Sequence, residues 1–166
     1  MRREIEYVSP DAYTLTETVV KVNRSAKVMK GGRRFSFSAL IVLGNREGIV
    51  GLGFGKANEV PPAVEKGVAD AKKRLVRVPL VGTTVPHPVM GVYRASRVKI
   101  MPAAPGTGVI AGKGARAILE AAGVKDVLTK AYGSTNAVNL VKAALDGLMK
   151  LRTRDQVARM RGVELR

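Results

Sequence analysis

One stretch decides the fold: a basic segment, two apolar segments and the glycine turn between them. It runs Lys27-Val-Met-Lys30-Gly31-Gly32-Arg33-Arg34, Phe35-Ser-Phe-Ser-Ala-Leu-Ile-Val-Leu43, Gly44-Asn-Arg-Glu-Gly48 and Ile49-Val-Gly-Leu-Gly-Phe-Gly55-Lys56-Ala57. The apolar segments bounded by glycine turns are typical of strands. Four cations around a glycine pair predict a flexible, positively charged connection between strands, because such a pair adds no core and costs entropy. We expect the glycine-spaced strand to let a polyanion backbone come close.

The segments on either side extend these strands into a β-β-β-α unit. Residues 16–29 alternate in part and predict a long first strand. After the glycine strand the period changes, and one face of a helix is predicted from Val60, Val64, Val68, Ala71 and Leu75. Asn58 is the expected N-cap, and Pro61 and Pro62 suit the first turn, where no amide donor is missed.

A second unit follows after a proline-rich connection. We expect a hairpin from 89–92 and 97–101, a helix over 115–122 stopped by Gly123, a strand within 124–132 and a core helix over 136–151. The chain therefore divides into an extended N-terminal arm (1–14), a first unit (15–77), a second unit (78–151) and a basic, weakly helical tail (152–166).

The charge balance indicates the class of partner. The 166 residues include 29 Lys and Arg against 13 Asp and Glu, a formal net charge of +16 with an isoelectric point near 10.7. Such an excess favours a nucleic acid, because contacts with phosphates release condensed counterions. Since 46% of the residues are hydrophobic, folded cores are available. Aromatic residues make up only 4%, with no Trp, which argues against a platform that stacks single-stranded bases.

Several classes of protein are disfavoured. No cysteine is present for a disulfide or thiolate metal site, and no apolar signal core or stretch of eighteen apolar residues occurs. We therefore expect a soluble cytoplasmic protein without membrane contact. The single histidine, His87, lies between two prolines and favours packing or one hydrogen bond over metal binding. Carboxylates such as Asp70 stand among lysines, as solvated pairs on helices do.

One segment imitates an enzyme signature. Gly106-Thr-Gly108-Val-Ile-Ala111 matches G-x-G-x-x-A, and Asp126 lies twenty residues beyond Gly106, as in dinucleotide sites. Pro102 and Pro105 separate the preceding strand from this turn, and too little chain remains for a doubly wound sheet. Glycines for tight packing at a strand–helix junction are the better interpretation, so we expect neither an enzyme nor a cofactor.

Several separated blocks resemble a known family. They are Val22-Asn23-Arg24 with Lys27, Lys30-Gly31-Gly32-Arg33, Phe35-Ser36-Phe37, Gly51-x-Gly53-x-Gly55-Lys56-Ala57, Glu59-Val60-Pro61, Pro102-Ala-x-x-Gly106-Thr-Gly108-Val-Ile-Ala111-Gly112, Lys130-Ala-Tyr-Gly-Ser-Thr-Asn136 and Arg161-Gly162. Over about residues 17–162 the chain resembles the family of the bacterial small-subunit ribosomal protein S five. It departs from the family pattern at Pro105 and Lys113.

The resemblance implies a fold and a function. The fold is α+β: a β-β-β-α domain like a double-stranded-RNA-binding domain, then an α/β domain with a left-handed βαβ crossover. The function is that of a structural constituent of the small ribosomal subunit that binds its rRNA, stabilises the head–body arrangement and contributes to decoding accuracy with protein S four. Proteins S four and S eight are the implied neighbours, close to the messenger entry path, and no homo-oligomer is expected.

The expected site residues fall into three sets, and no metal site is expected. RNA binding is expected from Arg24, Lys27, Lys30, Gly31, Gly32, Arg33, Arg34 and Lys56. A protein interface is expected from Gly106, Thr107, Gly108, Lys113 and Arg116. By resemblance, the loop near the spectinomycin site contains Ser25, Ala26 and Lys27.

Alternatives remain open for both the segment and the chain. The basic connection could be an ordinary hairpin turn that carries solubilising charge. The whole chain could be a free-standing RNA-binding regulator or, more remotely, a nucleotide-dependent enzyme.

Overall fold

A computed structural model describes residues 7–9 and 13–162, and these form two four-stranded sheets and four helices. The first sheet has the order β1 (Thr16–Met29), β2 (Gly32–Gly44), β3 (Ile49–Ala57) and β4 (Leu75–Arg77), all antiparallel. The second has the order β5 (Val89–Tyr93), β6 (Ser96–Pro102), β8 (Val127–Gly133) and β7 (Val109–Ile110). The helices are α1 (Val60–Lys72), α2 (Lys113–Ala122), α3 (Ala137–Leu148) and α4 (Arg154–Arg161).

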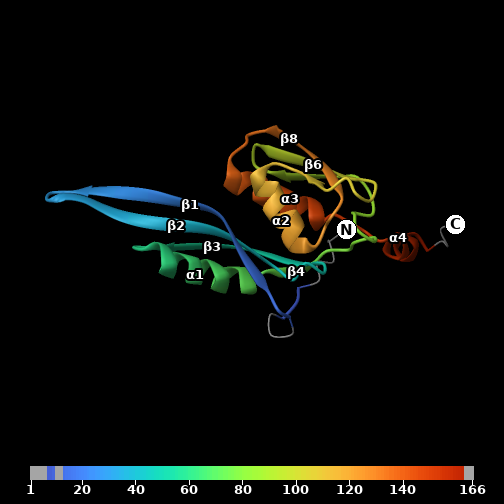
Figure 1. Cartoon of the computed structure of the whole chain (residues 1–166), viewed down its shortest axis with the longest axis horizontal. Coiled ribbons are helices and arrows are strands. Elements are labelled where there is room, and N and C mark those ends of the chain that lie inside the picture. The colour runs from blue at the N-terminus through green and yellow to red at the C-terminus, as the bar shows by residue number, and fades with distance from the viewer. Residues whose placement is uncertain (1–6, 10–12, 163–166) are drawn as a thin grey trace.

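The elements stack in layers, as Figure 1 shows. Helix α1 covers one face of the first sheet, and α2 packs on the other face against β1, β2 and β3. Helix α3 packs beside α2 and against β5 and β6 of the second sheet. The expected α+β class and the order β-β-β-α of the first unit are therefore confirmed.

The glycines of β3 pack against α1. A Cβ added at Gly53 would lie 1.9 Å from the carbonyl oxygen of Gly67, and one at Gly55 would lie 1.9 Å from that of Ala63. The helix backbone fills the space over this strand, so the expectation that the glycines admit a polyanion backbone is wrong. They are required because only a bare Cα permits so close a helix–sheet approach.

Two local expectations near α1 are also wrong. The N-cap is Glu59 rather than Asn58, and no side chain caps the helix. Leu75 continues the helical spacing in the sequence, but the helix ends at Lys72 and Leu75 belongs to β4. Strand β4 forms through tertiary pairing, since Ile49, Val50 and Gly51 of β3 supply its partners.

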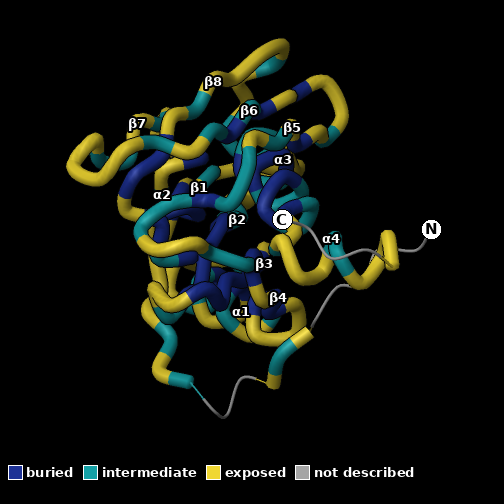
Figure 2. The backbone as a smooth tube through the Cα atoms, turned by 90° about the vertical axis from the view of Figure 1, so that its right-hand side faces the viewer, coloured by how far each residue is buried: buried dark blue, intermediate teal, exposed yellow. Residues whose placement is uncertain are grey.

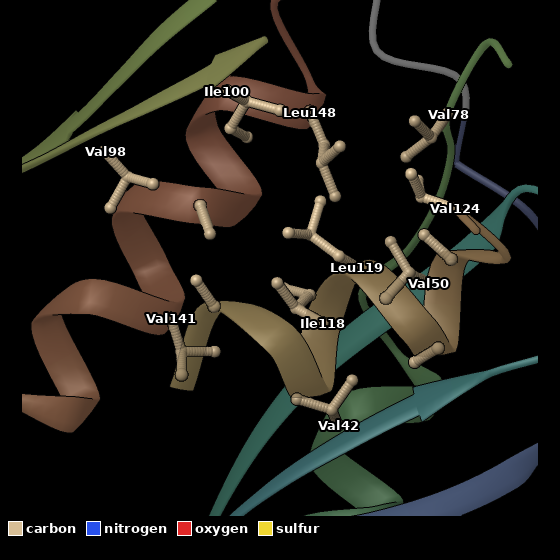
Figure 3. Close-up of a cluster of buried hydrophobic side chains, with 14 of the residues drawn as sticks. Val42, Val50, Val78, Val98, Ile100, Ile118, Leu119, Val124, Val141 and Leu148 are labelled. Carbon is tan, nitrogen blue, oxygen red and sulfur yellow. The ribbon is translucent and has the colours of Figure 1, made fainter. Parts of the chain in front are cut away.

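The larger core joins the two units. Val42 and Val50 of the first sheet lie in one buried cluster with Ile118 and Leu119 of α2 and Leu148 of α3. Figure 3 shows α2 between the first sheet and α3, with these side chains meeting across it. A second, smaller cluster lies beneath α1 and includes Ala39, Ile41, Leu43, Ala63, Ala71 and Leu75. Strand β2 supplies side chains to both clusters, and its residues 39–44 are buried on both faces.

The turn between β2 and β3 also connects the units. Its backbone N–H groups at Arg46 and Gly48 donate to the carbonyls of Ala121 (3.0 Å) and Ala122 (2.8 Å) at the end of α2. Such bonds satisfy carbonyls that a helix end leaves without intrahelical partners. The predicted helix stop is confirmed: Gly123 takes a left-handed conformation with φ of 92°.

The second sheet contains the parallel βαβ unit. Strands β7 and β8 are parallel and adjacent, and α2 connects them. The hand of this crossover stays a prediction from the resemblance. The predicted hairpin is present as β5 and β6, whereas the two-residue strand β7 was not expected.

In each sheet, a helix carboxylate accepts a backbone N–H group that no neighbouring strand pairs. Asp70 of α1 accepts the N–H of Phe54 (3.1 Å) on the side of β3 that β4 leaves open. Asp146 of α3 accepts the N–H of Val92 (2.9 Å) on the edge strand β5. Both carboxylates also pair with a cation four residues later, Arg74 and Lys150. Covered edges resist pairing with other chains.

The described parts of the predicted arm and tail have defined contacts. In the N-terminal arm, Tyr7 forms a β-bridge with Val76, and the N–H of Val8 donates to the carbonyl of Leu75 (3.2 Å). Residues 1–6 and 10–12 lie outside the described residues. In the tail, α4 has a Thr153–Gln156 capping box and no buried residue, as Figure 2 shows, and 163–166 are not described. His87 holds the start of the tail, because its Nε2 accepts the N–H of Arg152 (3.1 Å).

Candidate nucleic-acid interface

The hairpin of β1 and β2 has two different halves. In the inner half (16–23 and 37–44), β2 also pairs with β3, from Phe37 opposite Ala57 onward. In the outer half (24–36), the two strands pair only with each other and project beyond the rest of the molecule (Figure 1). Residues 24–35 are all exposed. The outer half is therefore a two-stranded arm without a core of its own.

The basic segment lies within this arm and is not a long loop. The strands stay paired up to Met29 opposite Gly32, so that Lys30 and Gly31 alone form the turn. Gly32 has a φ of 135°, which explains the need for glycine after the turn. Ser25, Ala26 and Lys27 were expected in a loop but are residues of β1, and the Ser25 hydroxyl donates to the Ser36 carbonyl (3.3 Å). Their proximity to the spectinomycin site stays a prediction.

The register divides the expected RNA-binding cations between two faces. Directly opposed residues of an antiparallel pair share a face, and successive residues alternate. Lys27 opposes Arg34 on one face, while Arg33 opposes Val28 on the other, the face that also carries Arg24. Lys30 lies at the turn between them. The outer half thus presents cations in two directions, with no Asp or Glu among its residues.

Lys56 extends the first of these faces toward the body of the sheet. It opposes Ser38, which in turn opposes Asn23 of β1. The strand alternation places Lys56 on the face away from α1, since Gly55 faces that helix. An open hollow of about 420 Å³ lies where β3 ends and α1 begins, and its lining includes Lys56 and Lys66. Lys66 was missed by the sequence reasoning, because only the fold brings it beside β3.

The other face carries an aromatic contact. The guanidinium carbon of Arg24 lies 4.6 Å from the centroid of the Phe35 ring, a cation–π distance. Phe35 opposes Ala26 and is 41% exposed. The sequence indicated Phe35 only as a strand residue, and the diagonal contact with Arg24 depends on the register.

The expected protein-interface residues form a second surface at the start of α2. Gly106, Thr107, Lys113 and Arg116 are exposed, and Arg116 donates to the carbonyl of Val109 (3.2 Å). The Thr107 hydroxyl donates to the Ala104 carbonyl (2.7 Å). The structure therefore gathers this set on a single ordered turn and the first turns of a helix.

Asp126 explains why this turn resembles a dinucleotide motif. One of its carboxylate oxygens accepts the N–H groups of Gly106 and Gly108, each at 3.0 Å, and its residue is only 5% exposed. The hydroxyl of Thr83, with the N–H groups of Gly108 and Gly106, lowers the pKa of Asp126 below its usual value. Positive φ angles of 90° and 77° account for both glycines. The acidic residue that would bind a ribose instead holds the turn in place.

The described residues contain no cluster of His, Asp or Glu that could hold a metal ion. Within the same residues, no helix is long and apolar enough to cross a bilayer.

Comparison with known proteins identifies the family. The family model of the ribosomal protein S5 N-terminal domain matches residues 15–79, and that of the ribosomal protein S5 C-terminal domain matches 91–161. The chain belongs to the ribosomal protein S5 family.

Curated relatives cover nearly the whole chain. The small ribosomal subunit protein uS5 of Rhodopirellula baltica is 55% identical over 149 residues, which cover 90% of this chain and 84% of the relative. That of Persephonella marina is 52% identical over 164 residues, 98% of this chain and 84% of the relative. That of Rubrobacter xylanophilus is 56% identical over 152 residues, which cover 92% of this chain and 76% of the relative. The family is structural rather than enzymatic, so the prediction that the chain is not an enzyme is confirmed.

Proposed function

We propose that the chain is a structural component of the small ribosomal subunit that grips rRNA with the outer half of its β1–β2 hairpin. Members of the ribosomal protein S5 family are ribosomal proteins of this subunit, bound to the ribosome in the cytoplasm with rRNA and other ribosomal proteins as partners. Finer assignments rest on the geometry of this chain and on the resemblance.

The observation that carries the proposal is the composition of an arm without a core. Residues 24–36 include five Lys and Arg residues and no carboxylate, and every residue in this range except Ser36 is exposed. A projecting two-stranded arm is only marginally stable by itself, so folding alone gives no reason for its length. A phosphate backbone supplies both the contacts and the countercharge that the arm lacks.

We assign phosphate binding first to Lys27, Arg34 and Lys56, which share the face away from α1. Lys30 at the turn and Arg33 on the other face extend the contact around the arm. Contacts with phosphates fix position and shape rather than base sequence. With both faces and the tip cationic, the arm suits a gap between RNA segments, in line with a role in stabilising the head–body arrangement of the subunit.

We assign the surface at the start of α2 to neighbouring proteins. Gly106, Thr107 and Gly108 form a turn held by Asp126, beside Lys113 and Arg116. A rigid, small-residue turn flanked by cations suits a protein contact better than a phosphate cradle, because Asp126 already occupies its N–H groups. We propose protein S four at this surface, with an influence on decoding accuracy and proximity to the messenger entry path, and protein S eight as a second neighbour.

Sedimentation tests the assignment to the subunit. Tagged protein from a lysate should comigrate with the small subunit through a sucrose gradient and resist a high-salt wash. Protein that stays at the top of the gradient, or that salt removes, would support a loosely bound regulator instead.

A charge series tests the hairpin. Changing Lys27, Lys30, Arg33 and Arg34 to Gln should flatten the salt dependence of binding to small-subunit rRNA, by about one in the logarithmic slope for each phosphate that the variant no longer neutralises. The matched control removes four exposed lysines elsewhere, with the same change in net charge: Lys72, Lys73, Lys125 and Lys130 to Gln. Equal slopes for the two variants would refute the hairpin assignment.

Decoding fidelity tests the second surface. Gly108→Leu should leave hairpin binding to rRNA intact and change the frequency of stop-codon readthrough in a reporter. Because Gly108 has a φ of 77°, this variant strains the turn, and Lys113→Glu provides a substitution at an exposed position without that strain. Normal readthrough with both variants would show that the interface is elsewhere.

A further inference from the structure

The α1-side face of the hairpin's outer half carries an exposed pair of side chains, Arg24 and Phe35, to which the proposed phosphate contacts assign no role. The guanidinium of Arg24 lies over the ring of Phe35 at 4.6 Å from its centroid, and Phe35 is 41% exposed. Strand β3 ends opposite Phe37, so no strand of the described chain continues beside Phe35. Guanidinium groups stack on aromatic faces, and both groups have planes on which a further ring can stack.

We propose that Arg24 and Phe35 form a stacking site for one unpaired nucleobase of the small-subunit rRNA. Bases splayed from an RNA fold stack on aromatic rings and on Arg guanidinium planes, and the contact tolerates any base because every base has a π-face. The inference rests on the proposed contact between hairpin and rRNA, and adds that the face with Arg33 also binds a base. Lys27 and Arg34 take phosphates, and Arg24 with Phe35 takes a base.

The surroundings favour a nucleobase over an apolar side chain of a protein. Arg33, on the same face as Phe35, and Arg34, next to it in the chain, keep the ring within a cationic surface, and the outer half contains no carboxylate. A single exposed Phe is common on protein surfaces and by itself indicates nothing. The guanidinium over the ring and the proposed phosphate-binding groups within the same arm distinguish this one.

The scarcity of aromatic residues limits the proposal to one base. With 4% aromatic residues and no Trp, the chain lacks the repeated platforms of proteins that bind single strands. One stacked base would instead fix the position of the arm along an RNA fold.

Ultraviolet crosslinking of intact small subunits tests the proposal, because irradiation at short wavelength joins stacked aromatic side chains to bases. Subunits that carry this chain are irradiated, digested with nuclease and protease, and searched by mass spectrometry for nucleotide adducts. The expected result is a mononucleotide adduct on Phe35. Adducts elsewhere in the hairpin but none on Phe35 would overturn the stacking site and leave the phosphate contacts standing. No hairpin adduct at all, together with an unchanged salt slope for the charge variants, would contradict the proposed function itself.

Substitutions sharpen the test. Phe35→Leu keeps an apolar strand residue without a π-face, and Arg24→Lys keeps the charge without the plane; each should weaken binding to small-subunit rRNA about tenfold. Phe54→Leu is the matched control, since Phe54 is 46% exposed on the opposite face of the sheet. Equal affinities for Phe35→Leu and Phe54→Leu would count against the site. If Phe35→Leu subunits do not assemble, the adduct map of the unchanged protein still decides.

Discussion

The two halves of the β1–β2 hairpin share strands and register but differ in what stabilises them. In the inner half, Ala39 to Leu43 of β2 are at most 2% exposed and contact α1 on one face and the α2 layer on the other. In the outer half, residues 24–35 are all exposed and pair only across the hairpin. One continuous ladder thus passes from a core strand to an arm that depends on a partner for its contacts.

The difference shows how the protein separates stability from binding. Burial of apolar side chains stabilises the inner half, at roughly 25 cal/mol per Å² of apolar surface. The side chains of the outer half bury no such surface, so folding does not restrict their charge and shape. We therefore expect substitutions in the two halves to move different measurements: the free energy of unfolding for the inner half, RNA affinity for the outer half.

The largest expected effect comes from a glycine of β3, the strand that pairs with the inner half. Gly55→Val would drive a Cβ to 1.9 Å from the carbonyl oxygen of Ala63 and 2.5 Å from the backbone nitrogen of Gly67, and these backbone atoms of α1 cannot move aside as a flexible side chain could. We expect a loss of more than about 3 kcal/mol in the free energy of unfolding, since overpacking against backbone lies at the severe end of such changes. Urea denaturation followed by circular dichroism measures it.

The control is a glycine of the outer half. A Cβ at Gly31 meets nothing within 4 Å, so Gly31→Ala should stay within about 0.5 kcal/mol of the unchanged protein. Comparable losses for both variants would mean that the halves are not distinct.

A smaller effect comes from truncating an apolar side chain in each half. Leu40 is 1% exposed within the larger core, so Leu40→Ala should cost about 2–5 kcal/mol of stability. Phe35→Ala removes the ring of a residue that is 41% exposed, and the cost should stay below about 1 kcal/mol. Denaturation curves for the pair measure the contrast. A Phe35→Ala variant as unstable as Leu40→Ala would place Phe35 in the folding core rather than in the binding arm.

The sequence predicted the order of strands and helix in the first sheet well, for a physical reason. The apolar runs of β2 and β3 and the change of period at Val60 are local signals, so strand and helix order followed directly. Strand β4 did not follow, because Leu75 continues the helical spacing and only pairing with β3 makes it a strand. The position of the helix N-cap was also wrong by one residue, Glu59 in place of Asn58.

The candidate site was predictable in charge but not in geometry. The cations of residues 24–34 stand out in the sequence, yet their division between two faces depends on a register that places Lys27 opposite Arg34. The glycines of β3 were assigned to the wrong neighbour, because a sequence does not show whether RNA or a helix occupies the space above a bare Cα. Asp126 likewise has an internal role that only the folded turn reveals.

A further prediction separates the two faces of the outer half. Lys27→Gln with Arg34→Gln should lower the salt slope of rRNA binding by about two, as both point to the proposed phosphate face. Arg24→Gln with Arg33→Gln removes the same charge but should lower the slope less and the affinity at high salt more, because stacking is less sensitive to screening. Filter binding across a series of salt concentrations gives both quantities. Identical curves for the two double variants would mean that the faces do not differ in what they bind.

The smallest expected effect is a pH-dependent loss of stability in the second unit, where the Asp126 carboxylate holds a turn. Asp126 has a lowered pKa in the folded protein, so its charged hydrogen bonds stabilise the fold at neutral pH. That contribution is complete above the unfolded value near 4 and is lost as the pH falls through the lower, folded pKa. Asp126→Asn should therefore lower the melting temperature by a few degrees at pH 7, and the gap should narrow below pH 4.

Thermal unfolding at pH 7, 4 and 3 measures that gap, with Asp155→Asn at the exposed start of α4 as the control. The outer half contains no carboxylate, so its own structure should not change over the same range, as amide signals of Lys27 and Arg34 in nuclear magnetic resonance spectra would report. A gap for Asp126→Asn that stays constant down to pH 3 would show that the hydrogen bonds to Gly106 and Gly108 do not depend on the charge. Low pH could then not be used to destabilise the unit that packs on the inner half while the outer half stays unchanged.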